Sequence, residues 1–289
     1  MTRARVWVAG ARPRTLGAAV VPVVLGTAIA GTATPLRTLG LFAVGLGMQV
    51  GVNFANDYSD GTRGVDTGAR VGPTRLVASG LASARAVLIA ALLSLAAAGV
   101  AGLALAITVD MRLLWVGAAA LVAALGYSGG PVPYAALGVA EVFVLAFFGF
   151  VATAGSSYVQ AGYVPDGAWW ASASMGLLAV GILEANNIRD IPTDAAVGKR
   201  TLAVRLGDRK ARTLYRSIVV LALLLPIGAV VADVLPLAVL VAWTAVPVAA
   251  NALRSVGTAE GPEMVRVLQG TALLHAHFGL LMAFMLWLT

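Results

Sequence analysis

Uncharged apolar stretches recur along the whole chain, and most are long enough to form a helix that crosses a membrane. A hydrocarbon core about 30 Å thick requires about 20 apolar residues in a helix, and several stretches run for about 17–25 residues without a charge. The pattern predicts an all-α integral membrane protein with about nine transmembrane helices. The expected spans are 15–33, 38–58, 84–107, 113–128, 134–158, 168–188, 213–232, 235–253 and 267–288.

Composition excludes a water-soluble protein. The chain is 60% hydrophobic and only 11% charged, whereas a soluble domain carries about 25% charged residues. Most of the outer surface is therefore expected to face membrane lipid. The chain has no cysteine, which excludes disulfides, thiolate catalysis and Cys-ligated metals. We expect residues 1–289 to form a single transmembrane domain.

Basic residues are distributed asymmetrically about the predicted spans. All Lys and Arg residues except Arg37 and Arg112 fall in the N-terminal segment or in loops after even-numbered spans. The positive-inside rule then predicts a cytoplasmic N-terminus and an external C-terminus, and the plasma membrane is the expected location. The net charge of +7 is explained by topology, and no nucleic-acid partner is expected.

Two polar segments interrupt the apolar pattern at the ends of the second and sixth spans, and both are predicted to be cytoplasmic. On a helix, residues three or four apart share a face, so each segment can project two carboxylates and amide groups along one side. Pro192 is expected to kink or end the second helix. The acidic and amide residues are Asn53, Asn56, Asp57, Asp60 and Asp66 in the first segment, and Asn186, Asp190 and Asp194 in the second.

The residue types in these segments favour binding of a metal and a diphosphate. Clustered carboxylates repel one another unless cations lie between them. Asp and Asn oxygens without His or Cys suit Mg²⁺, which commonly shares phosphate oxygens. Arg and Lys beside such a cluster suit a diphosphate leaving group. The basic neighbours are Arg63, Arg70 and Arg75 in the first segment and Arg189, Lys199 and Arg200 in the second.

These motifs resemble those of the UbiA-type intramembrane prenyltransferases. Asn56-Asp57-Tyr58-Ser59-Asp60 is similar to the family's first Asp-rich motif, and the segment from Arg75 to Gly80 is similar to its R-x-x-x-S-G element. Asp190-x-x-x-Asp194, followed by Gly198-Lys199-Arg200-Thr201, is similar to the second motif and its G-K-x-T tail. The resemblance covers nearly the whole chain. It departs at Gly64, where the family often has a third acid; here an acid follows two residues later, at Asp66.

Among UbiA-type enzymes the chain looks most like the 1,4-dihydroxy-2-naphthoate polyprenyltransferases of menaquinone synthesis. The turn from Gly126 to Tyr134 supports this likeness. The resemblance implies that a polyprenyl diphosphate ionises and that 1,4-dihydroxy-2-naphthoate attacks the allylic cation and loses CO₂. It implies Mg²⁺ held by Asp57, Asp60, Asp190 and Asp194, with Lys199 as a further catalytic residue. The implied substrate-binding residues are Asn53, Asn56, Arg63, Asp66, Arg75, Tyr127, Asn186, Arg189 and Arg200.

Two alternatives remain open at the level of the sequence. The Asp-rich motifs are shared by family members that prenylate 4-hydroxybenzoate, haem or homogentisate. A different class is a secondary transporter, since the two Asp segments lie at quasi-equivalent places, as an internal repeat would put them. Transporters tend to place coupling carboxylates near the midplane of the membrane, whereas these lie at helix ends, which favours an enzyme.

Overall fold

The chain folds into a bundle of long helices, as the apolar pattern predicts. A computed structural model describes residues 2–64, 74–129 and 133–289, and the regular elements in these ranges are all helical. The elements are α1 (Arg3–Ala11), α2 (Pro13–Ile29), α3 (Pro35–Thr62), α4 (Ala84–Thr108), α5 (Leu113–Ser128), η1 (Tyr134–Ala136), α6 (Ala140–Val144), η2 (Leu145–Ala154), α7 (Gly155–Ala161), α8 (Asp166–Ala196), α9 (Leu202–Leu206), α10 (Asp208–Val231), η3 (Leu237–Ala245), α11 (Val246–Ser255) and α12 (Pro262–Leu288).

Each of the nine predicted spans corresponds to a helical segment, but not all of them cross a membrane by themselves. In the described ranges, seven helical segments are long and apolar enough. An eighth span requires α1 and α2 together, which meet at a bend of 52°. The remaining segment, α5, has 16 residues and is shorter than a hydrocarbon core requires. The predicted count of nine is therefore approximate, while the class, a multi-pass helical membrane protein, is confirmed.

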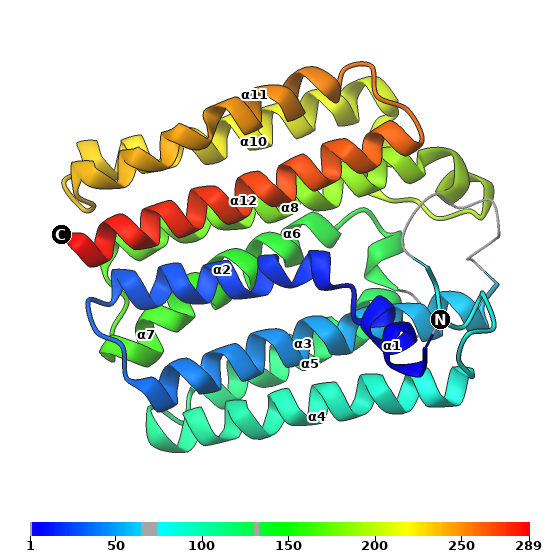
Figure 1. The fold of residues 1–289 in the computed structure, drawn as a ribbon, viewed down its shortest axis with the longest axis horizontal. Helices are drawn as coiled ribbons and strands as arrows, with labels where there is room; N and C mark the ends of the chain where they lie inside the picture. The colour runs from blue at the N-terminus through cyan, green and yellow to red at the C-terminus, as the bar shows by residue number, and fades with distance from the viewer. Residues whose placement is uncertain (1, 65–73, 130–132) are drawn as a thin grey trace.

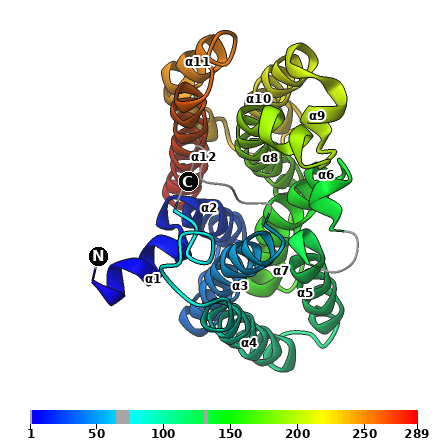
Figure 2. The same ribbon diagram turned by 90° about the vertical axis from the view of Figure 1, so that its right-hand side faces the viewer.

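Successive long helices run in opposite directions, so the chain begins and ends at opposite ends of the bundle (Figure 1). The last residues of α3 and α8 lie at the same end, which we call the motif end because both Asp-rich segments are there (Figure 1). Viewed toward this end, α2 and α3 lie opposite α6 and α8 (Figure 2). The topology therefore brings together two segments that are more than a hundred residues apart in the sequence.

Apolar side chains fill the interior and also cover much of the outside. The largest core cluster joins α2, α8, α10 and α12, with Met175, Tyr215 and Phe278 completely buried. On the outer faces of α4 and α5, Val100 is 70% exposed and Trp115 is 80% exposed. A soluble protein rarely exposes so many large apolar side chains, so this surface fits lipid contact.

The span from Ala140 to Ala161 has a wide helical turn in its middle. Its central segment, η2, is π-helical, a form that is rare and occurs mostly in short pieces. Gly149 in η2 packs directly on α8, where an added Cβ would lie 2.5 Å from the carbonyl oxygen of Ser172 and 2.8 Å from Cα of Gly176. Glycine is therefore required for this close helix contact, as is common between membrane helices.

The glycine contact gives a stability prediction. Gly149→Ala places a methyl group against backbone atoms that cannot rotate away, so we expect a cost of about 1–3 kcal/mol. The midpoint of thermal unfolding in detergent should fall by at least about 2 °C. Gly99→Ala, in α4, is the matched control, because its added Cβ would meet no atom within 4 Å. Equal midpoints for the two variants would contradict the packing argument.

Candidate active site

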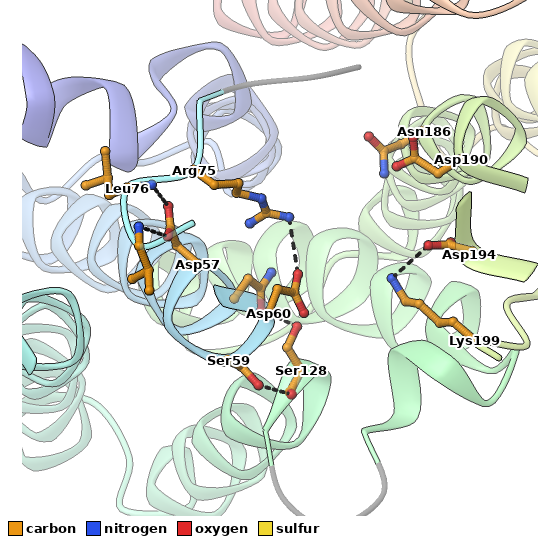
Figure 3. A network of polar contacts seen from close by, with 12 residues as sticks. Asp57, Ser59, Asp60, Arg75, Leu76, Ser128, Asn186, Asp190, Asp194 and Lys199 are labelled. Atoms are coloured by element: carbon orange, nitrogen blue, oxygen red, sulfur yellow. Dashed lines mark hydrogen bonds and ion pairs between the residues drawn. The ribbon is translucent and has the colours of Figure 1, made fainter. Parts of the chain in front are cut away.

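Asp57 is the most deeply buried carboxylate of the first motif. Its side chain is 0% exposed, and its Oδ2 and Oδ1 accept hydrogen bonds from the backbone N–H groups of Leu76 (2.8 Å) and Val77 (3.0 Å) (Figure 3). One carboxylate thus anchors the segment that returns from α3 toward α4. Each carboxylate oxygen has a further lone-pair site, so these bonds leave room for an additional ligand.

The amides of the first motif hold neighbouring helices in place. Asn53 donates to the carbonyl oxygen of Ala11 and to Oγ1 of Thr15, both at 3.0 Å. Asn56 accepts a hydrogen bond of 2.6 Å from Oγ of Ser128, the last residue of α5. The end of α3 is therefore fixed on one side to the α1–α2 junction and on the other to α5.

Asp60 lies one turn beyond Asn56, and its carboxylate faces the interior of the motif end. Its Oδ2 is 3.2 Å from a guanidinium nitrogen of Arg75, with side-chain exposures of 17% and 11% respectively (Figure 3). Arg63, at the C-cap of α3, is exposed. The predicted residues Asp60 and Arg75 are therefore in contact, and Arg63 follows Asp60 by three residues at the end of α3. Asp66 lies outside the described residues.

Asp190 on α8 is paired with the residue that precedes it. Nε and one terminal nitrogen of Arg189 each donate to a different oxygen of Asp190, at 2.7 Å. That terminal nitrogen also donates to Oδ1 of Asn186 at 2.7 Å. A two-point guanidinium–carboxylate pair is among the stronger polar contacts in proteins. The helix continues through Pro192 to Ala196, so Pro192 does not end it.

Asp194 and Lys199 are brought together by the turn that ends α8. Gly198 has a φ of +73°, a left-handed conformation that glycine adopts without strain. The turn lets the backbone N–H of Lys199 donate to the carbonyl oxygen of Asp194 at 2.9 Å. It also places Nζ of Lys199 3.5 Å from Oδ1 of Asp194 (Figure 3). This geometry is a physical reason for the Gly198-Lys199 dipeptide after the motif.

One cavity joins the two motifs. It has a volume of about 180 Å³ and receives residues from the end of α3, the end of α5, η1 and the turn after α8. Arg200, a predicted substrate-binding residue, does not line the cavity. Its side chain is exposed, and its backbone N–H donates a hydrogen bond to the carbonyl oxygen of Ala136. The lining residues are Asp60, Arg63, Ser128, Pro133, Ala135, Ala136, Val197, Gly198 and Lys199.

A ladder of aromatic rings starts beside this cavity and runs along the span that follows. Tyr127 meets Tyr134 edge-on, with ring centroids 5.4 Å apart, and Tyr134 stacks on Phe143 at 4.1 Å. Phe147 continues the series. Burial raises the pKa of the Tyr134 phenol above its usual range, so this hydroxyl stays protonated at neutral pH. Aromatic faces of this kind can contact an apolar chain or a cation.

Four further polar residues, of which the sequence marks only Glu141 and Glu184 as functional candidates, lie at the motif end. Arg12 has a left-handed φ of +53° at the α1–α2 bend, and its charge acts on the Tyr127 phenol. Glu141, Glu184 and Asn187 form a buried group between α6 and α8. An ionisable residue inside an apolar span is the sequence signal that points to the two glutamates. Arg12 has no comparable signal, because the N-terminal segment is basic throughout.

The oxygen donors at the motif end fit Mg²⁺ bound together with a diphosphate. In the ranges that the structure describes, no three acidic or histidine side chains gather closely enough to form a complete metal cage. Mg²⁺ does not require one, since it is usually held by one or two carboxylates, waters and substrate phosphates. Asp60 and Lys199 both line the cavity, Arg75 lies beside Asp60, and Asp194 lies beside Lys199 (Figure 3).

The fold and this arrangement define a multi-pass helical membrane protein with two Asp-rich helix ends around one polar cavity. The chain belongs to the UbiA prenyltransferase family, which it matches over residues 19–287. Membership in a family of enzymes decides between the two protein classes left open by the sequence: the protein is a prenyltransferase, and the transporter interpretation is wrong.

Individual relatives agree with this assignment. The chain is 45% identical over 274 residues to 1,4-dihydroxy-2-naphthoate octaprenyltransferase of Mycobacterium tuberculosis, covering 92% of this chain and 91% of the relative. It is 35% identical over 222 residues to the Escherichia coli protein of the same name, covering 73% of this chain and 72% of the relative.

Solved structures share the fold at low sequence identity. A UbiA homolog from Aeropyrum pernix has a TM-score of 0.69 at 16% identity over 95% of this chain and 97% of the other. A UbiA homolog from Archaeoglobus fulgidus, bound to DMAPP and Mg²⁺, has a TM-score of 0.66 at 15% identity over 96% of this chain and 98% of the other.

The two carboxylates of the first motif should respond differently to substitution. Asp57→Asn replaces one acceptor oxygen by an NH₂ group that faces a backbone N–H, so a buried donor loses its partner at a cost of about 1–3 kcal/mol. We expect a lower midpoint of thermal unfolding for this variant. Asp60→Asn should lower the midpoint less, because Asp60 is partly exposed and an Asn side chain retains an oxygen that can accept from Arg75. A midpoint for Asp57→Asn equal to that of the unmodified protein would disprove the anchoring role.

Proposed function

We propose that the protein transfers a polyprenyl group from a polyprenyl diphosphate to 1,4-dihydroxy-2-naphthoate, with release of diphosphate and CO₂, as a step of menaquinone synthesis. The observation that carries the proposal is the cavity lined both by Asp60 at the end of α3 and by Lys199 in the turn after α8. The names of the relatives support the naphthoate as acceptor. The Archaeoglobus homolog bound to DMAPP and Mg²⁺ supports a prenyl diphosphate as donor.

We propose that Asp57, Asp60, Asp190 and Asp194 hold Mg²⁺ together with the diphosphate of the donor. When bound, Mg²⁺ supplies positive charge that stabilises the leaving diphosphate. Asn53, Asn56 and Asn186 support the donor site from the same helix faces. Asn53 and Asn56 lie on α3, which is already held in place because Asn53 donates a hydrogen bond to Ala11 and Asn56 accepts one from Ser128. The first motif is thus held in position before substrate arrives, which reduces the entropy lost on binding.

The basic residues have a second function in this proposal. Without substrate, Arg75, Arg189 and Lys199 each neutralise a motif carboxylate. With substrate, these three carboxylates would hold the metal and the three basic groups would bind phosphate oxygens. Each charge of the three pairs would then keep an opposite charge beside it, whereas a charge left buried alone would cost several kcal/mol. Arg63 and Arg200 add positive charge at the entrance, where phosphate oxygens enter.

The chemistry then follows from charge placement. The bond between the first prenyl carbon and the diphosphate oxygen breaks, and both electrons leave with the diphosphate, which Lys199 and the guanidinium groups stabilise. The electron-rich naphthoate ring attacks the allylic cation through the carbon that carries the carboxylate. CO₂ then leaves, and the electron pair of the broken bond restores the aromatic ring. Tyr127 presents its ring to the cation, and the apolar bundle keeps water away.

We further propose that the motif end faces the cytoplasm at the plasma membrane. The support is the concentration of Lys and Arg in the N-terminal segment and the motif-end loops. The C-terminus, at the opposite end of the bundle (Figure 1), then lies outside. The prenyl tail is apolar, so the site must open toward membrane lipid while its polar part faces the cytoplasm. The chain is proposed to act as one domain.

The first test is product formation by purified protein in detergent with a polyprenyl diphosphate and 1,4-dihydroxy-2-naphthoate. We expect a prenylated naphthoquinol that requires Mg²⁺ and falls at least about 100-fold in Asp190→Asn, since such a loss is typical when a metal site is disturbed. Asp166→Asn is the control, because Asp166 is exposed and begins the same helix at its other end. Transfer only to 4-hydroxybenzoate or homogentisate would disprove the naphthoate assignment.

The two lysines of the chain offer a matched pair for testing Lys199. Lys199→Met removes a charge that we place on the leaving diphosphate, and a lost donor of this kind lowers kcat by about 100-fold to 1000-fold. Lys210→Met should leave kcat unchanged, because Lys210 is exposed on α10. Single-turnover measurements would separate the chemical step from product release. Equal kcat values for both variants would exclude Lys199 from the reaction.

A further inference from the structure

A group of three buried polar side chains lies deeper in the helix bundle than the Asp-rich motifs, farther from the motif end. Glu141 on α6 is 8% exposed, Asn187 on α8 is 7% exposed and Glu184 on α8 is 0% exposed. Nδ2 of Asn187 donates to Oε1 of Glu141 at 3.1 Å, and the carboxyl groups of Glu141 and Glu184 face each other. None of the three has a role in the proposed binding of the diphosphate.

The hydrogen bonding of this group is incomplete. In the parts of the chain that the structure describes, Oε2 of Glu141 and the oxygens of Glu184 have no hydrogen-bond donor besides the carboxyl group that each faces. Burying carboxyl oxygens without donors costs several kcal/mol, and ionisable groups inside membrane spans are rare unless they serve a function. The group therefore has the capacity to accept a hydrogen bond from a ligand.

Its depth places it where an acceptor ring must bind. Residues 184, 187, 190 and 194 follow one face of α8 at intervals of three and four. Glu184 lies six residues before Asp190, which is about 9 Å along the helix axis. The reacting prenyl carbon lies on the side of the diphosphate that faces the apolar interior of the bundle, because the prenyl tail that follows it is apolar. An aromatic acceptor that reaches this carbon comes to the level of Glu141.

The surroundings suit a flat ring that carries a hydroxyl group. Glu141 and Asp60 both lie close enough to the Tyr127 phenol for their charges to act on it, so Glu141 is near the aromatic residues beside the first motif. Phe143, two residues after Glu141, stacks on Tyr134. Aromatic faces next to a carboxyl acceptor provide contacts for both parts of a hydroxylated aromatic ring.

We propose that Oε2 of Glu141 accepts a hydrogen bond from a ring hydroxyl of the aromatic acceptor, with Asn187 and Glu184 holding the Glu141 carboxyl in place. This inference rests on the proposed function and assigns the acceptor subsite within it. The hydroxyl next to the carboxylate of the naphthoate is already engaged by that carboxylate. The free donor is the hydroxyl on the far side of the ring, and this one binds Glu141.

The test compares two unreactive ligands, 4-hydroxy-2-naphthoate and 2-naphthoate, which differ only in that hydroxyl. Their fluorescence gives dissociation constants for the full-length protein in detergent. A hydrogen bond to a carboxyl group corresponds to about a 10-fold to 100-fold preference. We expect the unmodified protein to prefer the hydroxylated ligand by at least about 10-fold. Glu141→Leu should reduce the preference to below about 3-fold, and Glu141→Gln, which retains an acceptor oxygen, should fall between.

The ratio of the two constants is measured on one variant, so a general loss of folded protein cancels. Glu263→Gln is the control, because Glu263 is exposed at the start of α12 and pairs with Arg266. In turnover, Glu141→Gln should raise KM for the naphthoate and leave KM for the prenyl diphosphate unchanged. An equal hydroxyl preference in Glu141→Leu and the unmodified protein would overturn the inference. A lack of naphthoate turnover in the unmodified protein contradicts instead the proposed function, which the binding ratio does not require.

Discussion

The cost of burying charge in an apolar bundle determines how the motif end is built. Each of the four motif carboxylates has a specific partner: backbone N–H groups for Asp57, Arg75 for Asp60, Arg189 for Asp190 and Lys199 for Asp194. Without these partners, the acids would repel one another and be expensive to desolvate. The pairing therefore lets the protein maintain a highly charged site at the end of an otherwise apolar structure.

The same pairing connects stability to function. Asp57 binds the backbone of the two residues that follow Arg75. The Asp57 carboxylate therefore also positions the Arg75 guanidinium that neutralises Asp60. The α1–α2 bend is fixed to α3 in a similar way through Asn53. The first Asp-rich motif is thus the joint between three helices as well as the proposed metal and diphosphate site. Substitutions of Asn53 or Asp57, which form these structural contacts, are expected to affect folding and catalysis together, unlike substitutions at the more exposed Lys199.

Much of the helical layout follows from the sequence because long apolar runs have few alternative structures in a membrane. The grouping of Asp190 with Asp194 also follows from helical spacing, and the structure retains it through Pro192. Contacts between distant segments are different. Asn187 meets Glu141 across 46 positions of the chain, and Asp57 binds a loop 19 positions later. Such contacts depend on how helices pack, which local periodicity does not encode. Pro13 is a local sequence signal for the bend before α2. No local signal indicates that the bend gives Arg12 a left-handed backbone conformation.

The π-helical segment η2 has a consequence for the angular phase of the span that contains it. Each residue in an α-helix turns the side-chain direction by about 100°, whereas a π-helix has more residues per turn. The stretch from Leu145 to Ala154 therefore rotates the outer half of the span relative to the end that carries Glu141. Gly149 can then face α8 at the same time as Glu141 faces Asn187. The wide turns thus let both Gly149 and Glu141 face α8, whereas a regular α-helix of the same sequence would point these two residues in different directions.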